Sequence, residues 1–157
     1  MHTVSFRDVS TAGLEESPAA DALAGLRANE ARYFHTKFGV DYAVCTPDER
    51  PEIVEWVLRV LREERGIEPA SRVLEVFAYD SDELFWPALY FADGLAVNVL
   101  WEKAPGGKRA VGFKLSSGME PPAELAAFKW ARQRSKLAGE IRGSYFVVKG
   151  DHPLPLR

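Results

Sequence analysis

The stretch that decides the fold is "FWPALYFADGLAVNVLWE", residues 85–102. Two runs rich in aromatic and β-branched residues, which favour strands, flank the dipeptide Asp93-Gly94. Asp-Gly between two such runs is a strong signal of a tight turn, because the turn needs residues that tolerate positive φ. The stretch therefore predicts a β-hairpin, and strands joined by hairpins pair in an antiparallel sheet.

A two-residue turn at 93–94 would fix the register of this hairpin. It would place Asn98 opposite Leu89, on the same face as Phe91. Both faces would then be largely apolar, whereas a hairpin at the protein surface has one polar face. Helices can cover one face, and we expect the N-terminal segment, a partner chain or a ligand to cover the other. Asn98 would then either bond to nearby backbone or orient a ligand.

Acidic residues stand directly before the hairpin, in "YDSDEL" at 79–84. Asp80, Asp82 and Glu83 fall in a connection between strands, where aspartate commonly bonds to its own backbone. The segment lacks the glycine and the distal glutamate of a calcium loop. We therefore predict loop acids here and no metal site.

The rest of the chain adds helices and further strands to the hairpin. Segment 46–66 is the clearest helix, with Asp48 as a cap, Pro51 in the first turn and Gly66 as the stop. The other predicted helices are 17–39 and 120–141, and the other predicted strands are 2–6, 40–45, 72–79, 109–117 and 143–150. This order indicates one α+β domain over 1–157, with a mainly antiparallel sheet of about five strands and two to three helices packed on it. We expect mobile ends at 1–16 and 150–157.

The predicted third helix, 120–141, carries two unusual charge patterns. Arg134 falls in the middle of its apolar arc, so its guanidinium must pair, stack or reach water. Glu75, in the predicted strand 72–79, and Asp80 at its end are candidate partners. Binding of an anion in a cleft between sheet and helix is the sharper interpretation. On the opposite side, three basic residues could contact a phosphate backbone, although such a stripe is also typical of any exposed helix face. These residues are Lys129, Arg132 and Lys136.

Composition places the chain among ordinary globular domains. The 157 residues are 46% hydrophobic and 27% charged. The single cysteine, Cys45, excludes an internal disulfide and a CxxC site. The sequence shows neither a secretory signal nor an apolar run that could span a membrane, so we expect a soluble, cytoplasmic protein.

Charge is distributed unevenly along the chain. Residues 1–100 hold 9 Lys and Arg against 18 Asp and Glu, whereas residues 101–157 hold 11 against 5. This asymmetry indicates either a basic face for an acidic partner or two segments that neutralise each other.

Motifs of known chemistry are scarce. The sequence contains no Walker loop, no G-x-S-x-G elbow and no HExxH motif. "VSFRDVS" at 4–10 and the Asp-Gly hairpin resemble acetyltransferases of the GNAT type. "GGKRAVGFK", residues 106–114, departs from the glycine loop that holds coenzyme A in that family. The resemblance therefore implies an acyltransferase-like enzyme only as an alternative.

Three hypotheses follow, and the first is a non-catalytic binding or interaction module. Its apolar sheet face would be completed by a protein partner, by a second copy of the chain or by a small apolar ligand. The residues assigned to this binding surface are Asn98, Arg134, Glu75, Leu89 and Phe91. The alternatives are a nucleic-acid binder that uses Lys129, Arg132 and Lys136, and a small enzyme with a cleft around Asn98, Arg134 and Glu75. We predict no catalytic residue, no cofactor and no membrane partner.

Overall fold

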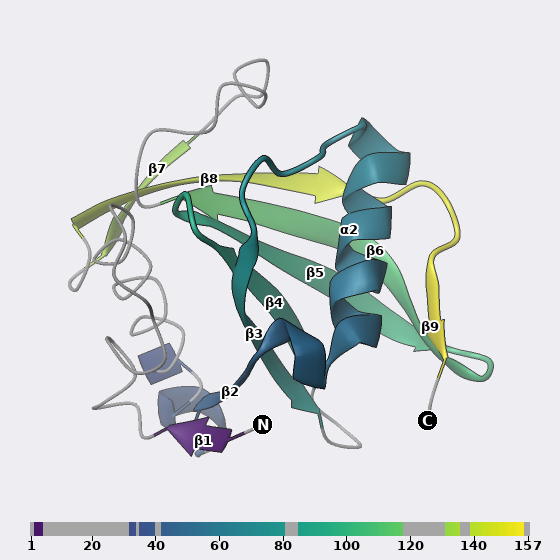
Figure 1. Cartoon of the computed structure of the whole chain (residues 1–157), viewed down its shortest axis with the longest axis horizontal. Coiled ribbons are helices and arrows are strands. Elements are labelled where there is room, and N and C mark those ends of the chain that lie inside the picture. Colours follow the sequence, from purple (N-terminus) through teal and green to yellow (C-terminus); the bar gives the residue numbers. More distant parts are fainter. Residues whose placement is uncertain are drawn as a thin grey trace.

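The computed structural model describes residues 2–4, 32–33, 35–39, 42–80, 85–117, 131–135 and 139–155. For residues 2–4, 42–44, 78–80, 131–135, 139–142 and 155 it describes the backbone only. These ranges form an antiparallel sheet with one long helix, α2, on one face (Figure 1). Within them, no helix combines the length and the apolar character needed to cross a membrane.

Helix α2 spans Pro51–Arg65, as its sequence pattern predicts. Pro51 occupies the first helical position, where its missing N–H costs nothing. Gly66 ends the helix at φ 64°, a left-handed conformation that glycine adopts without strain. The predicted cap differs, because Asp48 lies in a short 3-10 helix, η1 (Pro47–Glu49), and Arg50 precedes α2 without a side-chain cap.

The earlier predicted helix, 17–39, falls mostly outside the described residues. The described residues from 32 to 38 are helical, and the Gly39 N–H donates to the His35 carbonyl over 3.1 Å. Gly39 has a φ of 70°, so the helical stretch ends at the predicted glycine.

Neighbouring strands of the sheet all pair antiparallel, and the strands from β1 to β6 follow one another in chain order. Its order is β1-β2-β3-β4-β5-β6-β8-β7, and β9 also pairs with β6. Five strands are long, and the other four are short. The long strands are β3 (Val73–Asp80), β4 (Phe85–Phe91), β5 (Leu95–Ala104), β6 (Gly107–Ser117) and β8 (Gly139–Val147). The short strands are β1 (His2–Val4), β2 (Tyr42–Cys45), β7 (Ala131–Ser135) and β9 (Pro153–Pro155).

The predicted hairpin is present, but its register differs by one residue from the prediction. Leu89 pairs with Val97, and Asn98 pairs with Ala88. The turn is longer than expected: the Gly94 N–H donates to the Phe91 carbonyl over 3.1 Å, and Gly94 has a φ of 95°. This geometry fits a three-residue loop that ends in a left-handed glycine. Because a shift of one residue reverses every side chain, Asn98 lies on the opposite face from Leu89.

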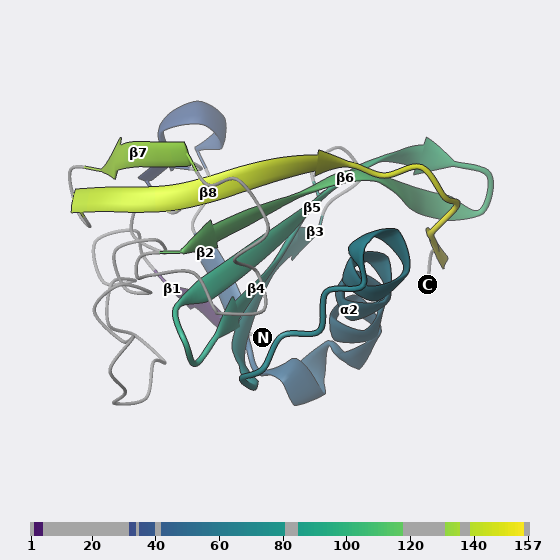
Figure 2. The same cartoon turned by 90° about the horizontal axis from the view of Figure 1, so that it is seen from above.

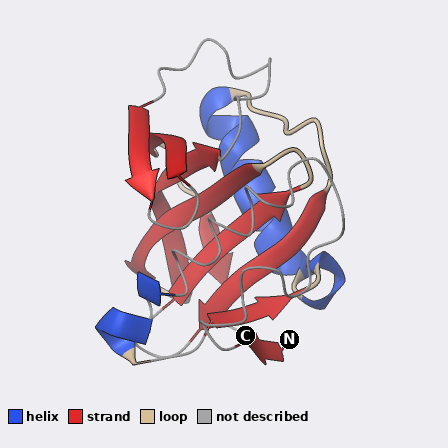
Figure 3. Ribbon diagram, turned by 90° about the vertical axis from the view of Figure 1, so that its left-hand side faces the viewer, coloured by secondary structure: helices blue, strands red, loops and turns tan. Residues whose placement is uncertain are grey.

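One face of the sheet, the helix face, packs against α2 and forms the core. Trp56, Val57 and Leu61 of α2 meet apolar residues of β4, β5 and β6 there. Leu89 and Phe91 belong to this core, with exposures of 0% and 1%. Figure 2 shows α2 on one side of the sheet, and in Figure 3 the strands cross in front of it.

Cys45 also belongs to this core. Burial raises the pKa of its thiol to about 11, and its Sγ lies 3.5 Å from the Val76 carbonyl oxygen. The residue therefore acts as a small buried hydrophobic side chain and not as a reactive thiol.

The predicted third helix is wrong over the part of 120–141 that the structure describes. Residues 131–135 form β7 and residues 139–141 begin β8, and the two strands pair with each other. Arg132 lies opposite Arg142, and Arg134 lies opposite Glu140 in this pairing. The Ala-, Lys- and Arg-rich sequence favours a helix locally, but pairing with a neighbouring strand overrides a propensity of less than about 1 kcal/mol per residue.

Candidate functional site

A pocket of about 270 Å³ opens on the sheet face opposite α2, which we call the pocket face. Its described lining comes from three strands and from the helical stretch near residue 33. The lining residues are Tyr33, Trp86, Ala96, Val97, Asn98, Lys114 and Ser116. The pocket is smaller than the roughly 300–1,000 Å³ of typical drug-sized sites, so its size suits a small ligand.

The strand register explains why the surface is hollow at this point. A row of paired residues crosses β4, β5 and β6 through Ala88, Asn98 and Lys114. In the next row, Ala96 pairs with Ser116. Side chains of paired residues stand side by side on one face, about 4.5–5.5 Å apart at Cβ. The small side chains in the middle of these rows leave a space that larger neighbours surround.

Asn98 lies at the floor of this pocket and is only 8% exposed. Its Nδ2 donates to the Pro87 carbonyl oxygen over 2.8 Å, which confirms the expected bond to nearby backbone. That bond holds the side chain in one orientation. It uses one of the two amide hydrogens, so the second hydrogen and the Oδ1 acceptor keep hydrogen-bonding capacity.

Aromatic rings form one wall of the pocket. Tyr33 and Trp86 lie with their ring centroids 6.0 Å apart at an interplanar angle of 45°. Phe38 adds an edge contact to Tyr33 at 6.1 Å. A pair of tilted rings offers polarisable faces and edges to a planar apolar group.

Two ammonium groups lie at the pocket. Lys114 lines it directly, and the Lys37 Nζ donates to the Tyr33 hydroxyl over 2.8 Å. Neither lysine forms an ion pair with a carboxylate of the described residues. The pocket therefore combines aromatic walls with positive charge.

The structure brings together only some of the residues that the sequence singled out. Asn98 lines the pocket, and Glu75, which pairs with Tyr90, is 4% exposed on the same face. Leu89 and Phe91 lie on the helix face, so the prediction that they lie on the same face as Asn98 is wrong. The cause is the shift of the hairpin register by one residue.

The predicted basic residues are placed on a strand or lie outside the described part. The backbone of Arg134 belongs to β7, which β6 and β8 separate from β5. Arg132 belongs to the same strand, whereas Lys129 and Lys136 lie outside the described residues. The predicted helical stripe of Lys129, Arg132 and Lys136 is therefore wrong at Arg132, which lies on a strand.

Sequence reasoning missed Lys114, Ser116, Trp86 and Tyr33 as neighbours of Asn98. Lys114 follows a glycine and a phenylalanine in a strand with alternating polarity, a pattern that usually indicates a solvated face. Its position directly opposite Asn98 depends on pairing between β5 and β6. A correct hairpin register would have indicated only that Trp86 and Asn98 share a face.

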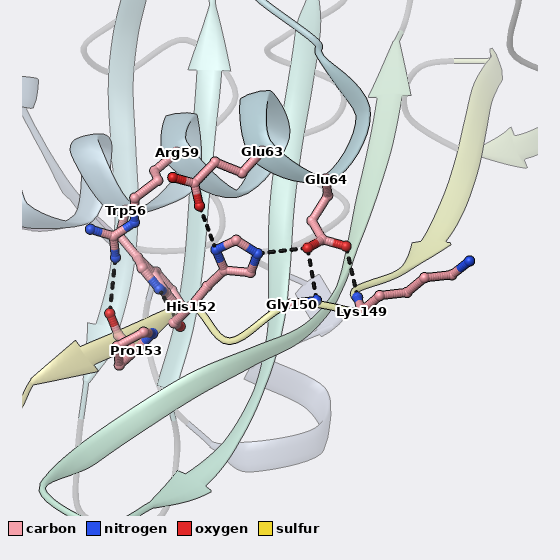
Figure 4. A network of polar contacts seen from close by, with 8 residues as sticks. All are labelled: Trp56, Arg59, Glu63, Glu64, Lys149, Gly150, His152 and Pro153. Carbon is pink, nitrogen blue, oxygen red and sulfur yellow. Dashed lines mark hydrogen bonds and ion pairs between the residues drawn. The ribbon is translucent and has the colours of Figure 1, made fainter.

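A second polar cluster holds the C-terminal segment against α2 (Figure 4). His152 is 3% exposed, and its Nε2 lies 2.7 Å from Glu64 Oε2. Its Nδ1 lies 3.2 Å from Glu63 Oε2. The His152 carbonyl oxygen accepts hydrogen bonds from Trp56 Nε1 and from the Ala110 N–H. Residues 150–155, expected as a mobile end, are thus held by this cluster and by the pairing of β9 with β6.

Glu64 is the centre of this cluster, which we call the tail clamp. It accepts backbone N–H groups of Lys149 and Gly150 at 2.7 and 2.9 Å. The hydrogen bond from Lys149, together with that from His152, lowers the pKa of the Glu64 carboxyl from 4.5 to about 2. An ionised carboxylate only accepts hydrogen bonds, so His152 Nε2 must be the donor. Both Glu64 oxygens accept hydrogen bonds from the C-terminal segment, so the tail clamp stabilises the fold. His152 Nδ1 is buried without a hydrogen bond and lies only in ion-pair range of Glu63.

No metal-binding cluster accompanies the pocket within the described ranges. None of their histidine, cysteine, aspartate and glutamate side chains gather in groups of three or more that could hold an ion.

The fold and the pocket define a single α+β domain with a small cavity on the sheet face opposite its helix. Residues 3–148 match the model of a family described as Domain of unknown function (DUF8821), and the chain belongs to that family. No curated protein and no solved structure gave a significant match.

Proposed function

We propose that this protein is a non-catalytic binding domain for a small organic molecule, which it takes into the pocket beside Asn98. One observation supports this most strongly. A hollow lined by two aromatic rings and three polar side chains lies on the pocket face, next to described residues that are almost fully buried. A concave, largely apolar site with a few convergent polar groups is typical of small-molecule binding.

Burial in the isolated chain favours a small ligand over a protein partner. Several pocket-face residues are inaccessible without a second chain, including Phe77 and Tyr90 at 0% exposure and Ala88 at 1%. At these positions the chain itself covers the pocket face, so no partner chain is needed to bury them. Exposed apolar side chains remain farther out on β8, at Tyr145 and Val147.

The other functional classes have less support. The nucleic-acid alternative rested on a helix that is a strand at Arg132. The enzyme alternative needs Asn98, Glu75 and Arg134 around one cleft, and Glu75 is not among the described residues that line the pocket. A cytoplasmic location stays a prediction.

Filling the pocket tests this proposal. Ala96 is 6% exposed and lines the hollow, so Ala96→Leu places a larger side chain in the ligand space. The probe is naphthalene-2-carboxamide, a neutral planar molecule with one polar group, and binding is measured by isothermal titration calorimetry. We expect wild type to bind it and Ala96→Leu to lose at least about 10-fold in affinity, a difference of about 1.4 kcal/mol.

Ala104→Leu is the matched control, because Ala104 ends the same strand and is absent from the pocket lining. It should bind the probe as wild type does. The proposal fails if wild type binds no probe, or if Ala96→Leu remains folded by circular dichroism and binds equally well.

A further inference from the structure

We infer that the ligand of this pocket is an aromatic carboxylate, bound with its ring against Trp86 and Tyr33 and its anionic group towards Lys114. This inference rests on the proposed function and specifies its ligand. It depends on the charges that surround the pocket and on the side of the pocket where each type of group lies.

The polar and apolar groups lie on different elements. The rings come from β4 and from the helical stretch near residue 33, whereas Lys114 and Ser116 come from β6. Asn98, on the strand between β4 and β6, lies between them. A ligand that satisfies both sides must have a planar apolar part at one end and a polar part at the other.

The polar end is a set of donors. Lys114 offers three ammonium hydrogens, Ser116 a hydroxyl, and Asn98 the amide hydrogen that Pro87 does not use. Lys114 and Ser116 are two positions apart on β6, so their side chains lie on the same face of the sheet. Asn98 is the cross-strand partner of Lys114. A carboxylate has two oxygens that only accept hydrogen bonds, so it matches such a set.

Space for the Lys114 side chain comes from Gly143 on β8. A Cβ built at Gly143 would lie 3.8 Å from Lys114 Cε and 3.5 Å from Ser116 Oγ. The absence of a side chain there leaves room beside both donors at the edge of the pocket.

Glu75, the buried acid that the described residues place on the pocket face, is too far away to form an ion pair with Lys114. Glu75 is on β3, and β4 and β5 separate it from β6. Three inter-strand spacings place the two strands roughly 14 Å apart, well beyond the roughly 4 Å of an ion pair. The second ammonium, Lys37 at the Tyr33 hydroxyl, adds to the positive charge on the ring side. An anion therefore has a stronger attraction to this pocket than a neutral molecule of the same shape.

A pair of probes of equal shape tests the inference. Naphthalene-2-carboxylate and naphthalene-2-carboxamide differ in charge at the polar end but share the ring. We expect wild type to bind the carboxylate roughly 10- to 100-fold more tightly than the carboxamide, as for a hydrogen bond that gains a charge. Lys114→Gln should remove most of that preference and bring the affinities for the two probes within about 3-fold of each other.

Lys103→Gln is the matched control, because it removes the same charge from an exposed position on β5 outside the pocket. It should keep the preference for the carboxylate. Equal binding of the two probes to wild type would overturn the inference while leaving the proposed function intact. The same holds if Lys114→Gln keeps the full preference. Failure of both probes to bind would instead reject the proposed function.

Discussion

At the scale of single residues, the fold depends on hydrogen bonds from side chains to backbone at two places. Asn98 bonds to the Pro87 carbonyl, and Glu64 accepts two backbone N–H groups and the His152 ring. The first of these side chains lines a pocket, whereas the second is enclosed in the tail clamp. A side chain that bonds to backbone therefore lines a pocket at one place and holds the C-terminal segment at the other.

Glu64→Gln should destabilise the protein by about 1.5–3 kcal/mol, because a neutral amide cannot accept from all three donors with the strength of a carboxylate. The measurement is the free energy of unfolding in urea. Glu63→Gln is the matched control, since Glu63 lies on the same helix, contacts the same histidine and is 51% exposed. It should cost less than about 1 kcal/mol. Equal losses in the two variants would contradict the central role of Glu64.

The low pKa of Glu64 also predicts how stability depends on pH. A carboxyl whose folded pKa is about 2, against an ordinary 4.5, contributes stability above pH 4.5 and loses it as the pH falls towards 2. Wild type should therefore lose stability over this range more steeply than Glu64→Gln, which has no proton to take up at this position. Urea unfolding at several values between pH 5 and pH 2.5 checks this, and parallel curves for the two proteins would contradict it.

At the scale of elements, local patterns predicted those parts of the fold that local forces determine. Helix α2 ends at the predicted glycine, and β3, β5 and β6 lie where runs of β-branched and aromatic residues predicted them. The failures depend on pairing between strands. The segment at 131–135 has helical composition, but it pairs with β8.

The candidate site was predictable only in part for the same reason. Asn98 was recognisable as an amide among apolar residues. Its neighbours were not, because one extra turn residue at Ala92 reverses the faces of the hairpin. Lys114 lies 16 positions farther along the chain, and only the pairing of β5 with β6 places it beside Asn98.

The packing of β6 against β8 leads to a prediction at Gly112. A Cβ at this position would lie 2.9 Å from the Phe146 carbonyl oxygen and 2.8 Å from the Tyr145 hydroxyl. The backbone contact cannot be relieved by rotation of a side chain, so Gly112→Ala should destabilise the protein by about 1–3 kcal/mol. Gly143→Ala, whose Cβ would approach no atom closer than 3.1 Å, should cost less. Thermal unfolding of both variants checks the order, and the reverse order would contradict this packing.

At the scale of the whole molecule, the two faces of the sheet are packed differently. The helix face meets α2 and supplies the core, whereas the pocket face keeps a hollow among residues that are mostly buried. Small residues in the middle of the cross-strand rows produce this hollow without interrupting the sheet. The binding proposal therefore depends on the position of the pocket as much as on its residues.

The most direct test of that position is a map of probe binding by NMR. Naphthalene-2-carboxylate is titrated into ¹⁵N-labelled protein, and shifts are followed for backbone amides and for the indole N–H groups of Trp86 and Trp56. We predict that the largest shifts occur at Trp86, Asn98, Lys114 and Ser116, while Trp56 on the helix face remains unchanged. Shifts concentrated at Trp56 and α2, or the absence of any saturable shift, would contradict a ligand site on the pocket face.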